Sequence, residues 1–171
     1  PWAMNELPFF DDVTMVCGMD VYHNTGKKSQ SLLAFCASIN PRATKYWSTC
    51  KVQGNVGEEL SNTLEGIMSD ALKAFKDTNG RFPNKIIIYR DGVGQSQQTA
   101  VLTHELPQIT QALKNLDRNA GEKIKMMMVL VNKRVSQRFF NNENPSRLCN
   151  PVPGTVINSG VVDPNTYDFF L

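Results

Sequence analysis

The chain has 171 residues, of which 41% are hydrophobic and 20% charged, a globular composition that suits one compact domain and argues against disorder. Its net charge of +2 leaves nucleic-acid binding open, because a basic groove can lie within a balanced total. The four scattered cysteines form no CxxC pair, which argues against zinc and favours buried, reduced thiols in a cytoplasmic or nuclear protein. No stretch approaches the roughly 20 apolar residues of a membrane-spanning helix.

Three strands are expected first along the chain. Apolar runs rich in strand-forming residues predict strands over 13–22, 31–39 and 45–52. The turns between them are short, so an antiparallel meander is expected.

Helical periodicity replaces the strand pattern after residue 57. Apolar residues at three- and four-residue steps predict a helix from residue 58 that ends at Asn79-Gly80. A strand over 85–89 follows. A second helix is expected over 97–116, with Pro107 either bending it or marking its start. Its apolar face would consist of Leu102, Leu106, Ile109 and Leu113.

The last predicted elements are less regular. Residues 123–132 predict a strand with both faces covered, residues 139–153 a loop, and residues 154–162 and 167–171 two further strands. The order βββ-α-β-α-β predicts an α/β fold with a mixed sheet flanked by helices. This order resembles the RNase H-like fold, which many nucleases, integrases and transposases share, so the fold alone does not assign an activity.

Two aspartates stand at special places in this pattern. Asp20 lies within the first strand and Asp91 ends the fourth, so the two carboxylates would meet if the strands are neighbours. Adjacent carboxylates repel unless a cation joins them, and Mg²⁺ (or Mn²⁺) is the natural partner in phosphodiester hydrolysis. The alternative is structural: Asp91 could cap a turn, and Asp20 could pair with a buried cation. Finding both acids together, with the cost of burying a charge in mid-strand, favours the metal site.

Several segments of the chain resemble one known family. GMDVYH at 18–23 and YRDGVG at 89–94 look like the two aspartate motifs of the Piwi domain in Argonaute/Piwi proteins. The similarity runs along nearly the whole chain, and it leans toward the Piwi branch in NPVPGTVI at 150–157 and YDFFL at 167–171. It implies that residues 1–171 are the N-terminal and central part of a Piwi domain. A start at Pro1 and an end inside an apolar run also predict an excised fragment.

The resemblance implies an RNA-guided endonuclease. A small guide RNA would pair with a target RNA, which is cut opposite the guide. On the Piwi branch the resemblance implies a Piwi-interacting RNA as the guide and germline transposon silencing as the biological role. Asp20 and Asp91 match the family's metal-binding aspartates. A catalytic glutamate is expected at the start of the first helix, where Glu59 is favoured and Glu58 is the alternative. Acidic residues in a first helical turn also interact favourably with the helix dipole, and this structural role is enough to explain at least one of the two glutamates.

Other implied roles concern RNA contacts and the limits of the fragment. Lys133, Arg134, Arg138 and Gln97 are expected to contact RNA. The acid and glycine that the family commonly shows before this glutamine are missing here. The family's catalytic histidine lies beyond Leu171, so the fragment alone is expected to be inactive.

Two other functions remain open from the sequence. One is a guide- and target-binding module that does not cut and that silences through partner proteins. The other is an unguided RNase H-like nuclease or transposase.

Overall fold

The computed structural model describes residues 14–23, 31–40, 42–53, 60–94, 97–116, 123–142, 147–164 and 166–171. The chain divides into two compact units, Pro1–Lys133 and Arg134–Leu171. The first unit contains every named helix and strand of the described residues. No helix among the described residues is long and apolar enough to cross a membrane.

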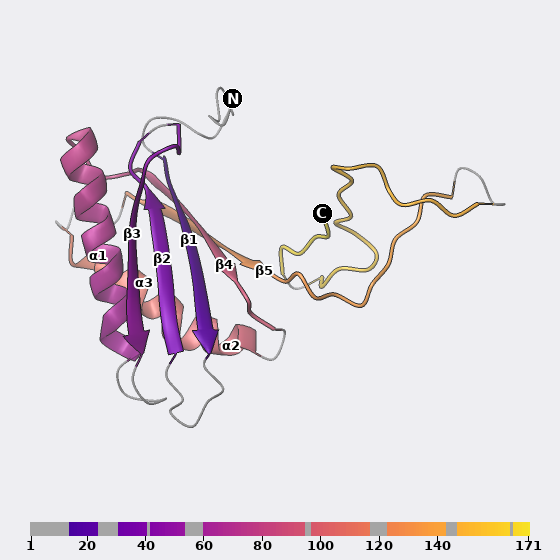
Figure 1. Ribbon diagram of the computed structural model, residues 1–171, viewed down its shortest axis with the longest axis horizontal. Helices are drawn as coiled ribbons and strands as arrows, with labels where there is room; N and C mark the ends of the chain where they lie inside the picture. The colour runs from indigo at the N-terminus through magenta and orange to yellow at the C-terminus, as the bar shows by residue number, and fades with distance from the viewer. Residues whose placement is uncertain are drawn as a thin grey trace. The chain divides into compact units, whose positions relative to one another are not determined.

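A five-stranded mixed sheet forms the centre of the first unit (Figure 1). Its strands are β1 (Thr14–His23), β2 (Ser31–Ser38), β3 (Tyr46–Gln53), β4 (Lys85–Asp91) and β5 (Lys125–Val131). Their order across the sheet is β3-β2-β1-β4-β5. The β1, β2 and β3 strands form the predicted antiparallel meander, whereas β4 pairs in parallel with both β1 and β5. The predicted mixed sheet and element order are confirmed. The strand predicted over 85–89 continues for two more residues and ends at Asp91.

The helices follow the predicted order, with one irregularity. Helix α1 (Leu60–Asn79) ends before Gly80, whose φ of 72° is the left-handed conformation that terminates helices. The second predicted helix is split into α2 (Gln98–Ala100), the π-helical turn η2 (Val101–Glu105) and α3 (Leu106–Lys114). Pro107 lies in the first turn of α3, so it marks the start of a helix, which was one of the two roles predicted for it.

The π-helical turn changes which side chains of this segment are buried. Leu102 was expected on the apolar face, but it is 59% exposed, and Val101 is buried instead. A π turn holds more residues than an α turn, so the helical register shifts across it and the predicted spacing no longer applies. Ile109 and Leu113, which come after the turn, are buried as predicted.

One face of the sheet packs against α1 and α3, and the hydrophobic core lies between them. Alternate residues of β1, β2 and β4 meet the apolar stripes of both helices in a single cluster. Its largest members that are almost completely buried include Phe75, Met15, Leu33, Met68, Leu72, Ile86, Ile88 and Ile109.

The opposite face of the sheet is open. Tyr22, Val52 and Tyr89 are exposed on it, and Met127 of β5 is 53% exposed. The prediction that both faces of the fifth strand are covered is therefore wrong for the part of the chain that the structure describes: β5 lies at the edge of the described sheet, and Met127 on its open face is half exposed.

The cysteines are only partly as expected. Cys17 is buried, and burial raises the pKa of its thiol, but Cys36 is half-buried and Cys50 and Cys149 are exposed. All four are free thiols. The expectation of buried thiols therefore holds fully only for Cys17, because Cys36 and Cys50 lie on the open face of the sheet.

The second unit, Arg134–Leu171, has little regular structure among its described residues. Single bridges join Asn141 to Cys149 and Ile157 to Phe170. The Phe170 ring also packs against Phe139, with ring centroids 5.0 Å apart. The two strands predicted over 154–162 and 167–171 are reduced to the one bridge between Ile157 and Phe170. Gly160, with a φ of 79°, turns the chain within the first of them.

Candidate active site

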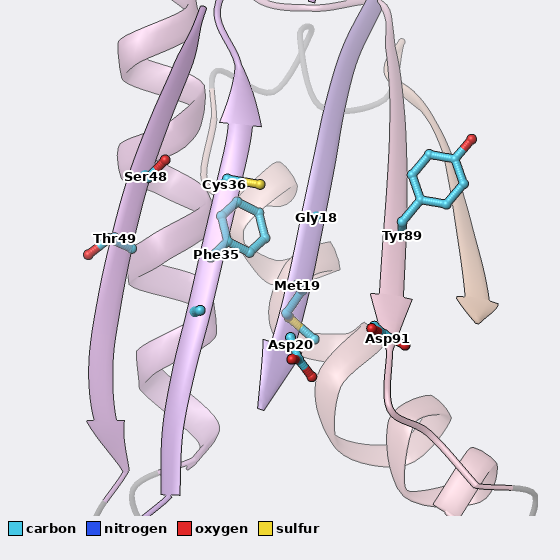
Figure 2. Close-up of a pocket in the computed structure, with 10 residues that line it drawn as sticks. Gly18, Met19, Asp20, Phe35, Cys36, Ser48, Thr49, Tyr89 and Asp91 are labelled. Carbon is cyan, nitrogen blue, oxygen red and sulfur yellow. The ribbon is translucent and has the colours of Figure 1, made fainter. Parts of the chain in front are cut away.

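The parallel pairing of β1 and β4 brings Asp20 and Asp91 to the same end of the sheet. Met19 pairs with Arg90, so Asp20 and Asp91 stand one step further along the two strands. Strand alternation places both on the open face. Figure 2 shows the two carboxylates side by side at the carboxyl ends of neighbouring strands. A Cβ added to Gly92 would lie 3.3 Å from Asp20 Oδ1, so the chain after Asp91 passes directly beside the Asp20 carboxylate.

A groove with a volume of about 420 Å³ crosses the sheet and reaches this acidic pair (Figure 2). Small side chains form its floor, among them Gly18, Ala34 and Ser48 on three neighbouring strands. Their small size is what hollows the surface: a Cβ at Gly18 would come within 3.1 Å of Cys36 Sγ. The carboxylates are thus reached from an open groove.

Asp91 is held by two hydrogen bonds. The main-chain N–H of Gly92 donates to Oδ1 at 2.9 Å, and the ammonium of Lys133 forms a short ion pair with Oδ2. The hydrogen bond from Lys133 is the main reason that the pKa of Asp91 lies below its usual value. The Gly92 N–H and the charges of Lys133 and Arg90 act in the same direction, while desolvation opposes them. The same bond to Asp91 is the main cause of the raised pKa of Lys133.

Asp20 is exposed at the end of the sheet. Its Oδ1 accepts a hydrogen bond of 2.8 Å from the main-chain N–H of Val21. The expectation that Asp20 carries the cost of a buried charge is therefore wrong, because the groove beside it admits water. No described cation forms an ion pair with Asp20 within 4 Å, so the structural alternative of a buried partner is not met. The exposed carboxylate remains accessible to a ligand.

The donor set at this place fits a magnesium ion. Among the described residues no group of three or more histidine, cysteine, aspartate or glutamate side chains gathers as a metal site, so the local set is the two aspartates. Mg²⁺ binds in this way, through one or two carboxylates, with water and substrate phosphates as its other ligands. The ammonium of Lys133 already shows that a cation is favoured at Asp91. The predicted catalytic glutamate, Glu59 with Glu58 as its alternative, lies outside the described residues.

The residues predicted to contact RNA are placed differently from one another. Lys133 lies at the acidic pair itself. Gln97 closes the loop after Asp91: its N–H donates to the Gly94 carbonyl at 2.9 Å, and its Oε1 accepts from the Gly94 N–H at 3.2 Å. Arg134 and Arg138 belong to the second unit, where Arg138 Nη1 donates to the carbonyls of its own loop at 2.9 and 2.8 Å.

Two further charged residues beside the site were missed by the sequence reasoning. Arg90 is only 7% exposed, and its guanidinium makes two parallel bonds of 2.9 Å to the carboxylate of Glu105 in η2. Strand alternation could have shown that Arg90 faces the core, opposite to Asp91. No local signal identifies Glu105 as its partner.

The topology and the acidic pair together define an RNase H-like α/β domain. The family model of the Piwi domain matches residues 2–171, and the chain belongs to this family. It is 40% identical over 157 residues to Piwi-like protein 1 of Danio rerio, covering 92% of this chain and 18% of the relative. It is 37% identical over 170 residues to Protein argonaute-3 of Drosophila melanogaster, covering 99% of this chain and 18% of the relative.

Solved structures agree with this assignment. The crystal structure of Drosophila Piwi superimposes with a TM-score of 0.75 at 27% identity, covering 97% of this chain and 21% of that one. Kluyveromyces polysporus Argonaute with a guide RNA gives a TM-score of 0.68 at 25% identity, covering 86% of this chain and 18% of that one. The chain therefore spans about a fifth of the length of these relatives. The predicted family and the predicted fold class are both confirmed.

Proposed function

We propose that the protein containing this chain acts in small-RNA-guided silencing, and that this domain cuts target RNA by Mg²⁺-dependent phosphodiester hydrolysis. The observation that carries the proposal is the pair of carboxylates, Asp20 and Asp91, on an open groove at the ends of two parallel strands. Membership of the Piwi domain family supports the guide-dependent part, as does the guide RNA in the Kluyveromyces polysporus Argonaute structure. The Piwi-like relatives favour a Piwi-interacting RNA as the guide.

The charged residues at the end of the groove each have a part in the proposed reaction. Asp20 and Asp91 would hold the metal, with a glutamate at 59 or 58 as a third acid. When bound, Mg²⁺ would neutralise charge on the scissile phosphate and activate water. Lys133, whose side chain is 70% exposed, would leave Asp91 when a divalent cation arrives and would then be free to contact a backbone phosphate. The open, small-residue floor leaves the carboxylates accessible from the groove.

The decisive experiment uses the full-length protein loaded with a synthetic guide and given a matched target RNA. We expect cutting at one site in Mg²⁺ and none in EDTA. Asp91→Ala should lower the cutting rate by more than about 100-fold, because a lost metal ligand removes several kcal/mol of transition-state stabilisation. Guide binding, measured by filter retention, should be unchanged.

A matched control removes a carboxylate elsewhere. Asp77→Ala makes the same substitution on the exposed side of α1, and it should leave both cutting and guide binding unchanged. Loss of guide binding together with cutting in Asp91→Ala would assign Asp91 a structural role. Tight binding of guide and target by the unmodified protein without cutting in Mg²⁺ would favour a binding module that silences through partner proteins. Cutting without a guide would instead indicate an unguided nuclease.

A further inference from the structure

A buried ion pair lies directly behind the acidic site, on the covered face of the sheet. Arg90 precedes Asp91 in β4 and points the opposite way, toward η2 on the covered face of the sheet. Its Nε and Nη2 donate to the two carboxylate oxygens of Glu105, each at 2.9 Å. The side chains of Arg90 and Glu105 are only 9% and 15% exposed. A buried pair of this kind adds little stability, because desolvation of both charges offsets their attraction.

The remaining end of the guanidinium connects this pair to the site. Arg90 Nη1 donates a short hydrogen bond to the main-chain carbonyl of Asp91. The N–H of the same peptide group, on Gly92, donates to Asp91 Oδ1 at 2.9 Å. One peptide plane is therefore held at both ends: by Arg90 at its oxygen and by the Asp91 carboxylate at its nitrogen. Any rotation of this plane would move the N–H that orients the carboxylate.

The π-helical turn explains how a glutamate reaches the interior at this point. The N–H of Leu106 bonds to the carbonyl of Val101, a step of five residues that widens the helix and ends at Glu105. Such turns are rare and frequently occur at functional sites. Here the shifted register buries Val101 and turns the Glu105 carboxylate to the guanidinium of Arg90.

We propose that Arg90 and Glu105 are positioning residues that set the orientation of the Asp91 carboxylate through the Asp91–Gly92 peptide. The inference rests on the proposed function, in which the Asp91 carboxylate is a metal ligand. Mutation of a residue that hydrogen-bonds to a metal ligand, without touching the metal itself, commonly changes metal affinity or activity by 10- to 100-fold.

The test measures metal binding as well as cutting in the full-length protein. Glu105→Gln keeps the shape of the side chain but removes its charge, and Arg90→Lys keeps the charge but loses the two-pronged contact. For both variants we expect the Mn²⁺ dissociation constant, from electron paramagnetic resonance of free Mn²⁺, to rise about 10-fold or more. The Mg²⁺ concentration for half-maximal cutting should rise in parallel, with guide binding unchanged. If Arg90→Lys fails to fold, the nearly isosteric Glu105→Gln provides the test.

Ile109→Val is the matched control for a purely structural effect. Ile109 is fully buried on α3, the helix that follows Glu105, and its truncation lowers the melting temperature without removing a charge or a hydrogen-bonding group. Variants at Arg90 and Glu105 that lower the melting temperature like this control, but leave Mn²⁺ affinity and Mg²⁺ dependence unchanged, would overturn the inference. Failure of the proposed function looks different: Asp91→Ala would then bind Mn²⁺ as well as the unmodified protein does.

Discussion

The two faces of the sheet differ in what they carry. The covered face packs Met15, Leu33 and Ile88 against two helices and contains the Arg90–Glu105 ion pair, whereas the open face holds a groove with carboxylates at its end. Arg90 and Asp91 are neighbours in the chain, yet they belong to opposite faces. Strand alternation thus separates the residues that stabilise the domain from those of the proposed active site, although Arg90 and Asp91 are joined directly by one peptide bond.

The largest expected effect tests whether stability resides on the covered face. Phe75 on α1 is 1% exposed, and Phe75→Ala should lower the free energy of unfolding of the 171-residue chain by about 3–5 kcal/mol. Met127→Ala on the open face should cost less than about 1 kcal/mol, because its side chain is already half in water. Urea unfolding followed by circular dichroism measures both. Equal losses would mean that the open face is covered in solution.

A pair of glycines sharpens the comparison at the site itself. Gly80 and Gly92 both have positive φ, 72° and 78°, so alanine should cost about 1–2 kcal/mol of stability at either position. They differ in their surroundings: an added Cβ meets nothing within 4 Å at Gly80, but it lies 3.3 Å from Asp20 Oδ1 at Gly92.

We therefore expect Gly92→Ala to reduce cutting by the full-length protein at least 10-fold, because it displaces a proposed metal ligand. Gly80→Ala, measured in the same cleavage assay, should cut normally despite a similar loss of stability. Unchanged cutting by Gly92→Ala would show that the position of Asp20 beside this turn does not matter to the reaction.

These comparisons depend on features that the sequence predicts to different degrees. The meander and the alternating helices follow from local periodicity. The meeting of Asp20 with Asp91 also requires that their strands are neighbours, which the resemblance to the RNase H-like order suggested. The exposure of Leu102 could not be foreseen, because one π turn shifts the helical register without a clear local signal. The exposure of Met127 could not be foreseen either, because an apolar run fits a covered strand and an edge strand equally well.

The charged partners of the site were the least predictable part. Lys133 lies 42 residues from Asp91, and Glu105 lies 15 residues from Arg90. Such pairs depend on where the fold brings distant segments, which periodicity does not encode. The sequence marked Lys133 as a cation for RNA, and the structure adds its contact with a proposed metal ligand.

The smallest expected effect compares the exposed ion pair of the site with an ordinary surface pair. Lys133→Met removes the partner of Asp91, and Lys73→Met, which loses a 3.6 Å contact with Asp70 on α1, is the control. The pKa of Asp91 is lowered in the folded state, so its contribution to stability is complete above the unfolded value of about 3.9 and is lost as pH falls through the lower folded value. The pKa of Lys133 is raised, so its contribution is complete below about 10.4 and is lost as pH rises through the higher folded value.

The stability difference between the unmodified chain and Lys133→Met should therefore be constant between about pH 4 and pH 10 and should shrink on either side. It should also shrink in high salt, because the pair is exposed to solvent. Urea unfolding across this pH range measures the difference, and Lys73→Met should show a smaller one, since its contact is longer and both partners are well exposed. A difference for Lys133→Met that persisted unchanged into strong acid would mean that the lysine stabilises the open face by packing its aliphatic chain, because the Asp91 carboxylate is then protonated and no ion pair remains to be lost.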